Sequence, residues 1–498
     1  MCIPSKSPAD WSRQAFGTGI STLKLVGEAH HIVSSGQMIG ALRRSKSAHL
    51  SDVEAKKRIW RNVFGVPKSQ LGLYHELVSA IQIPVTFHLD ALLVDNRKDA
   101  SQSVLRRLQG NMPDLVSFNP SLIDQEPWEK VSNVKVTEDK KLAEVSLLPL
   151  VFLFLTHMTT HTFVSDGLLS DQDHQETGPL LLAFVQSYSL LMSGIPRWLP
   201  HPTLPGAHIT RRKLLGHLDA LLDITEDAEL QNDLLTARSR MLDDHRTPQP
   251  IRTIELLRLL HGLNAPHILA FWTLLHVISE PNLLEQIRHE AKQVVSIEQE
   301  KPVMGFTVPP RLKIDSTVLL GKKTKLLQKC WLESARVYSR GQESWTTTES
   351  FELDGGEGGV FKTADKWKIE KGEWIDAPFW HGNSDPAAWE EVSEWDPTRH
   401  GGPGDEDIFA SSKVLQDRKS ALSHRESVVL IRITAALFGM NEATKPARLF
   451  GLAFIASAVL LYDFELDGDK SIPKPKFAAG VALPEEDVRV RIRKRVTA

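Results

Sequence analysis

The sequence predicts a mainly helical protein with a smaller β region, built as one large domain. Over most of residues 95–300, apolar residues recur at spacings of three and four, which is the pattern of α-helices with a buried face. After residue 364 the pattern changes to short alternating stretches separated by turns, which indicates strands. The chain has 498 residues, of which 41% are hydrophobic and 24% charged, so it can bury a substantial core.

The beginning of the chain predicts two short strands after a polar extension. Residues 1–20 have no apolar signal core, so we expect an N-terminal extension without a membrane anchor, followed by one domain over residues 21–498. The stretches STLKLVG (from Ser21) and HHIVSS (from His30) are β-like, and GQMIGALRRSK after them is helical in pattern.

The middle of the chain predicts long helices. The stretches GPLLLAFVQSYSLLMSGI, RRKLLGHLDALLDI and DAELQNDLLTARSRMLDD each carry apolar residues at helical spacing. The segment from Arg252 to Ser279 is the longest candidate and is apolar on most faces, so we expect it to be central and buried. Pro266 should kink it, because proline lacks the backbone N–H and clashes with the preceding turn.

The last third predicts hairpins and one apolar helix. DGGEGGVF, from Asp354, is typical of a hairpin loop. A Phe438-Gly439 turn precedes an apolar helix, and KPKFAAGVALPEEDVRVRIRKR predicts a terminal hairpin. Within it, RVRIRKR alternates apolar and basic residues, which indicates an edge strand rather than a binding patch.

Composition and the most apolar run argue against nucleic-acid and membrane partners. The formal net charge is −3, and the run from Ser146 to Thr156 is far shorter than the roughly 20 residues that span a bilayer. The two cysteines, Cys2 and Cys330, fit a reducing compartment. We therefore expect a soluble, cytoplasmic protein. His157 and His161 in HMTTH have zinc-ligand spacing, but the motif lacks the glutamate and a third ligand, so we expect no metal site.

The order of the later motifs resembles the cytochrome P-450 (haem-thiolate monooxygenase) fold family. A Glu-x-x-Arg helix with Glu333 and Arg336 is followed by KGEWI, DPAAW, WDPTRH, and then the Phe-Gly loop and its helix. LLMSGIPRWLPHP and the closing strands are similar to the sterol-hydroxylase and prostacyclin-synthase-like branch, much of it fungal. The resemblance implies that Arg399 of WDPTRH joins Glu333 and Arg336 in a structural cluster.

The same resemblance implies that the haem-holding residues are absent. When the family's loop motif is aligned on Phe438-Gly439, its ligand cysteine falls on Lys445 and its loop arginine falls on Ala443. The other propionate arginine falls on Trp345, and the acid and alcohol that handle protons fall on Asn264 and Ala265. A lysine is ordinarily a cation and a poor iron ligand, and unpaired propionates would be costly to bury. We therefore expect no haem or other cofactor, and not a monooxygenase.

A haem-free scaffold would hold a large apolar cavity, or a filled core, between the central helix and the roof. Such a cavity suits a terpenoid or polyketide intermediate of fungal secondary metabolism. The leading hypothesis is a cofactor-independent cyclase, a pericyclase such as an intramolecular Diels–Alderase, because positioning and one hydrogen-bond donor can promote such a reaction.

The candidate donors are His261, Asn264 and His267, and the candidate substrate-binding residues are Phe271, Trp345, Lys445 and Ala265. For each of them the alternative is a packed helix or core residue. Two other functions stay open. One is a non-catalytic carrier that passes an apolar intermediate to other enzymes of the pathway. The other is a haem protein with a non-cysteine ligand, acting as an isomerase or dehydratase.

Overall fold

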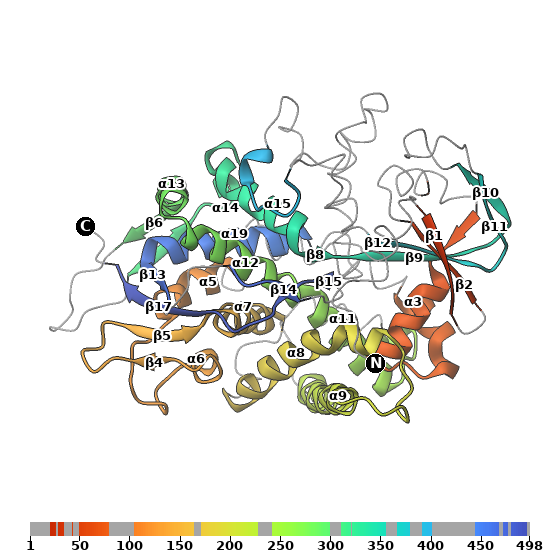
Figure 1. The fold of residues 1–498 in the computed structure, drawn as a ribbon. Helices are drawn as coiled ribbons and strands as arrows, with labels where there is room; N and C mark the ends of the chain where they lie inside the picture. The colour runs from red at the N-terminus through yellow and green to blue at the C-terminus, as the bar shows by residue number, and fades with distance from the viewer. Residues whose placement is uncertain are drawn as a thin grey trace.

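The structure is a computed structural model, drawn in Figure 1, in which helices predominate over strands. The described residues are 20–25, 28–33, 42, 49–78, 104–163, 171–227, 242–298, 310–319, 321–354, 366–378, 391–400, 444–467, 472–476 and 480–495. The predicted mixture of a larger helical and a smaller β part is confirmed for these ranges. Among the helices in them, none is both long enough and apolar enough to cross a bilayer.

Two consecutive helices form the centre of the molecule. They are α11 (Gln249–Asn264) and α12 (His267–Ser279), and the interruption between them falls at Ala265 and Pro266, where the sequence predicts a kink. Almost every residue of α12 is buried. It packs against α7 (Leu147–Phe163), α13 (Pro281–Ala291), α15 (Lys325–Tyr338) and α19 (Thr444–Leu461) (Figure 1). This apolar segment is thus buried because helices cover it on several sides.

Two long outer helices lie along the lower side of Figure 1 and cover α11 and α7. They are α8 (Asp171–Met192), which contains Pro179, and α9 (Leu204–Asp227). Both were predicted from their apolar spacing. The predicted helices GQMIGALRRSK and DAELQNDLLTARSRMLDD lie largely outside the described residues. The shorter helices are α3 (Val53–Ile59), η1 (Trp60–Phe64), η2 (Lys68–Gln70), α5 (Val104–Asn111), η4 (Met112–Asp114), α6 (Pro127–Val131), α14 (Ser316–Leu319), η5 (Lys322–Thr324) and η6 (Pro397–Arg399).

A five-stranded sheet forms the end of the molecule at the right of Figure 1. Its order is β1 (Ile20–Leu25), β2 (Glu28–Val33), β12 (Trp374–Pro378), β9 (Gln342–Thr347) and β3 (Leu50–Ser51). Only the β2–β12 pair is parallel. The sheet has a hydrophobic core of its own, which is separate from the helical core and includes Trp345. The two predicted N-terminal strands are therefore confirmed as β1 and β2.

Beside this sheet, β10 (Phe351–Asp354) pairs with β11 (Lys366–Ile369) as an antiparallel hairpin. The strands agree with the predicted hairpin, while most of the DGGEGGVF loop between them lies outside the described residues. A further antiparallel pair joins β6 (Val295–Glu298) and β7 (Arg311–Ile314).

The C-terminal strands differ from the prediction. RVRIRKR forms β17 (Arg489–Lys494), which lies between β13 (Tyr462–Leu466) and β5 (Ala143–Ser146) in a four-stranded sheet completed by β4 (Lys135–Val136). The prediction of an edge strand is therefore wrong. Alternation indicates that one face of the strand is buried, here the face that carries Val490 and Ile492. It does not indicate how many strands lie alongside.

The rest of the predicted terminal hairpin is divided between two small sheets. β14 (Pro475–Lys476) pairs with β16 (Leu483–Pro484), as a hairpin would. Between them, β15 (Gly480–Val481) pairs instead with β8 (Ser339–Arg340), directly after α15. The pairing of β15 with β8 thus attaches the C-terminal segment to the end of α15.

Candidate functional site

A buried cluster on α15 ties that helix to the loop of residues 391–400. Arg336 donates from Nε to Oε2 of Glu333 (2.9 Å) and from Nη2 to Oε1 (2.7 Å), and both residues are almost fully buried. The amide of Asp396 donates to Glu333 Oε1 (3.0 Å), His400 Nε2 lies 2.9 Å from Oε2, and Arg399 Nε lies 3.6 Å from Oε1. The structure therefore brings Glu333, Arg336 and Arg399 together.

The electrostatics of this cluster favour an ionised carboxylate. Burial raises the pKa of Glu333, but hydrogen bonds from Arg336 and His400 outweigh it and lower the pKa to about 2. Arg336 also donates to the carbonyl oxygens of Val392 (3.1 Å) and Glu394 (2.9 Å). Glu333 is thus the point at which the 391–400 segment is anchored to the helical core.

The Glu-x-x-Arg spacing alone does not identify this cluster. Two other helices carry the same spacing and the same pairing, with Glu255 bound to Arg258 in α11 and Glu285 bound to Arg288 in α13. Only Glu333 also binds residues of the 391–400 loop among the described residues. Sequence reasoning missed His400, although it directly follows Arg399 in the quoted motif.

Among the described residues of the two central helices, His267 is the buried polar side chain without a hydrogen-bond partner. It lies at the start of α12, with ring centroids 6.1 Å from Phe152 of α7 and 5.9 Å from Phe450 of α19. Neither ring nitrogen has a hydrogen-bond partner among the described residues. Burial lowers the pKa of His267 to about 3, so the ring is neutral at physiological pH. A neutral imidazole offers one N–H donor and one acceptor.

The other two predicted donors, His261 and Asn264, already have contacts with neighbouring side chains in the core. His261 is enclosed by aromatic rings, stacked on Tyr188 at 4.7 Å and edge-on to Phe64 (5.8 Å) and Phe184 (5.7 Å). Asn264 accepts a hydrogen bond from Thr159 Oγ1 (2.5 Å) and donates to the carbonyl oxygen of Leu260 (2.8 Å), which ties α11 to α7. Both residues therefore contribute to the packing of the core.

The predicted substrate-binding residues do not form one group. Phe271 is buried in α12 beside Trp272, with ring centroids 5.1 Å apart, and Ala265 lies in the turn before α12. Trp345 belongs instead to the separate core of the five-stranded sheet. Lys445 lies in the first turn of α19, and its side chain is outside the description, as are Phe438, Gly439 and Ala443.

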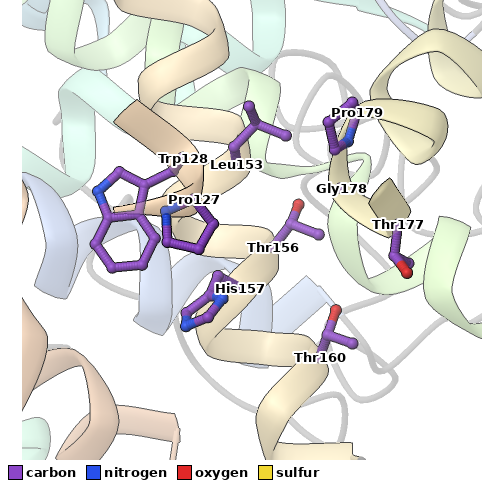
Figure 2. A pocket seen from close by; sticks show the side chains of 9 residues that line it. All are labelled: Pro127, Trp128, Leu153, Thr156, His157, Thr160, Thr177, Gly178 and Pro179. Carbon is purple, nitrogen blue, oxygen red and sulfur yellow. The ribbon is translucent and has the colours of Figure 1, made fainter. Parts of the chain in front are cut away.

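A small pocket lies between α6, α7 and α8 (Figure 2). Its volume is about 20 Å³, enough for roughly one water molecule and far below the roughly 300–1,000 Å³ of ligand pockets. Figure 2 shows Thr156 and Thr160 of α7 opposite Thr177 and Pro179 of α8. The buried hydroxyls of Thr156 and Thr160 have no hydrogen-bond partner among the described residues, so a water molecule here would satisfy them.

The first residue of the HMTTH motif, His157, also lies at this pocket. His157 lines it and packs against Trp128, with ring centroids 4.9 Å apart. Within the described ranges, no three histidine, cysteine or acidic side chains gather as metal ligands would. His161 lies in α7, but its side chain is outside the description.

The described residues do not fit a haem thiolate. Cys330 is fully buried inside α15, and burial raises the pKa of its thiol, so the thiolate that would bind iron is disfavoured. Cys2 lies outside the described residues. At the position that the resemblance gives to the ligand cysteine, the chain has Lys445 in a helical turn.

No protein-family model matches the chain, and no curated protein matches it.

Proposed function

We propose that the chain is a haem-free protein of the cytochrome P-450 fold that works as a cofactor-independent cyclase. Its substrate would be a neutral, apolar terpenoid or polyketide intermediate of fungal secondary metabolism, and the reaction a pericyclic ring closure such as an intramolecular Diels–Alder addition. The fold assignment is supported by the anchoring of the 391–400 loop on Glu333, the acid of the Glu-x-x-Arg pair. Lys445 in place of the ligand cysteine supports the haem-free part.

The observation that carries the proposed activity is the unpaired ring of His267. Leaving a buried donor unsatisfied costs about 1–3 kcal/mol, so a bound partner would be strongly favoured. A carbonyl oxygen on the substrate can accept the imidazole N–H. The neutral ring requires a neutral partner, because there is no imidazolium charge to balance a buried carboxylate.

A hydrogen bond to a carbonyl conjugated with the reacting alkene withdraws electron density from it and lowers the barrier to cycloaddition. In a water-poor site, one such donor is typically worth a factor of about 10²–10³ in rate. The aromatic neighbours Phe152 and Phe450 would hold the folded substrate against the ring, which removes part of the entropic barrier. No proton transfer or redox step is needed, because a cycloaddition only rearranges electron pairs.

The test uses purified full-length protein and a linear polyene that carries a diene, an alkene and a conjugated aldehyde. We expect ring closure faster than in buffer, and a loss of about 10²-fold or more in the His267→Phe variant, which removes the donor. Thr273→Val is the matched control. It also removes a buried polar group from α12, but one that is satisfied by the carbonyl of Leu269. Equal rates for wild type and His267→Phe would contradict the role of His267, and no acceleration at all would contradict the cyclase.

A carrier without catalysis is the second candidate, and the engagement of two predicted donors favours it, since His261 stacks on Tyr188 and Asn264 binds Thr159. Phe152, Phe271 and Phe450 are almost fully buried, so a ligand enters only if side chains move. Isothermal titration with the cyclised product, together with the rate assay, separates the two functions: a carrier binds tightly without turnover. An absorbance spectrum tests the third possibility, since a Soret band at stoichiometric haem would overturn the haem-free proposal.

A further inference from the structure

A hydroxyl, an imidazole and a carboxylate lie in line on the five-stranded sheet, away from the helical core. Thr22 of β1 lies directly opposite His31 of β2, and its Oγ1 is 2.8 Å from His31 Nδ1. The other ring nitrogen, Nε2, is 2.9 Å from Oε2 of Glu373, which immediately precedes β12. Thr22 and His31 thus come from neighbouring strands, Glu373 comes from the residue before the next strand of the same sheet, and His31 lies between the other two side chains.

Glu373 fixes which nitrogen of His31 carries the proton. Burial raises the pKa of Glu373, but hydrogen bonds from the Glu370 amide and from His31 outweigh it, so the pKa is lowered and the group is a carboxylate. A carboxylate can only accept, so His31 must donate from Nε2. In the neutral ring Nδ1 is then the acceptor, and the hydroxyl of Thr22 donates to it.

This is the arrangement that activates a hydroxyl as a nucleophile, with a base beside it and a carboxylate that orients the base. The burial of the members suits their roles. His31 is buried and held in place, whereas Thr22 is exposed and can be reached by a substrate.

We propose that Thr22, His31 and Glu373 form an acyl-transfer site that takes accessible neutral carboxylic esters, independently of the proposed cyclase. Thr22 Oγ1 attacks the ester carbonyl carbon, and its proton passes to His31 Nδ1. The new bond joins Oγ1 to the acyl carbon, the bond from that carbon to the leaving oxygen breaks, and His31 returns the proton to the leaving group. Water then attacks the acyl-threonine in the same way, which releases the carboxylic acid and restores Thr22.

The neighbouring histidine provides a built-in comparison. His30 also binds a carboxylate, with Nδ1 2.8 Å from Asp376 Oδ2, but its Nε2 has Glu28 at 3.8 Å and no hydroxyl. It is adjacent in the same strand and therefore points to the other face of the sheet. His30→Gln thus perturbs the same strand and removes a carboxylate-bound imidazole without touching Thr22.

The experiment treats the full chain with p-nitrophenyl acetate and follows acetylation of each threonine by peptide mass spectrometry. We expect Thr22 to be acetylated about 10²-fold or more faster than other exposed threonines, since a positioned base contributes about 10²–10⁴-fold. The preference should vanish in His31→Gln and persist in His30→Gln. Glu373→Gln should also abolish it, because a side-chain amide can donate to Nε2 and leave the proton on Nδ1, facing Thr22.

Two substitutions at exposed Thr22 keep the test decisive if a buried variant is unstable. Thr22→Val should remove the fast acetylation at this position, and Thr22→Ser should retain it. Acetylation of Thr22 at the rate of other exposed threonines, or an undiminished rate in folded His31→Gln, would overturn the proposal. Since this readout uses neither a polyene nor His267, it fails or succeeds separately from the cyclase.

Discussion

Three buried histidines of the helical core, His261, His267 and His276, have pKa values lowered to about 3, chiefly by burial. In an unfolded chain a histidine has a pKa of about 6.5. Between pH 6.5 and 3 the unfolded state therefore binds protons that the folded state does not. Stability is fully present above pH 6.5 and is lost as the pH falls through this window.

We predict that each of these histidines contributes up to about 1.4 kcal/mol per pH unit to the acid loss of stability. Urea unfolding at pH 5.0, 6.0 and 7.0 measures the slope. His267→Phe should reduce it by about this amount and should also stabilise the protein at pH 7, because it removes two unpaired buried nitrogens. An unchanged slope in this variant would mean that His267 is protonated or solvated in the folded state.

From the sequence alone, the roles of these residues could not be separated. His261, Asn264 and His267 lie within one apolar stretch, and helical spacing makes all three plausible donors. What separates them comes from other elements: Tyr188 and Phe64 enclose His261, and Thr159 binds Asn264. Each of these contacts joins residues more than 70 positions apart, so the local sequence does not indicate them.

Between elements, the three Glu-x-x-Arg pairs allow a matched comparison. Glu333→Gln removes the buried carboxylate that binds Arg336, and leaving this buried cation uncompensated costs about 3–5 kcal/mol. Glu285→Gln breaks the same i,i+3 geometry at the surface, where Glu285 is 67% exposed, and should cost under about 1 kcal/mol. Chemical denaturation of both variants measures the difference. Equal costs would contradict the anchoring role of Glu333.

The contact between α15 and α19 allows a second comparison. A Cβ added at Gly451 of α19 would lie 2.4 Å from Cζ3 of Trp331 on α15, so Gly451→Ala forces the helices apart. We predict a loss of about 1–3 kcal/mol, as for other overpacked cores. Gly216→Ala in α9 meets nothing within 4 Å and should instead stabilise the protein by about 0.5–1 kcal/mol. Thermal melting of the two variants should therefore shift in opposite directions.

Element by element, the sequence predicted what is local and missed what depends on neighbours. The break between α11 and α12 follows from Pro266 itself, and the helical parts of α8 and α9 follow from their apolar spacing. The alternation of Val490 and Ile492 correctly indicated a strand with one buried face. The place of β17 between β13 and β5 depends on residues far away in the chain. So does the position of Trp345 in the core of the five-stranded sheet.

In the molecule as a whole, the two proposed sites lie at two separate hydrophobic cores. His267 belongs to the helical core, and Thr22 lies on the sheet that carries the second one. The two proposed sites share no residue and use different physical means. The first requires a dry interior and a neutral donor, and the second requires an exposed nucleophile beside a buried base. Variants at one site should therefore leave the other active.

The central place of β17 also governs when this protein can fold during synthesis. Arg491 of β17 binds Glu144 of β5, a partner 347 positions earlier in the chain. Until β17 leaves the ribosome, β5 has only the two-residue β4 beside it among the described strands, so its other edge lacks the partner strand β17. The nascent chain therefore carries that edge through most of its translation. A chaperone that shields it would raise the yield of folded protein in a heterologous host, whereas a stop codon before Arg489 would leave it exposed permanently.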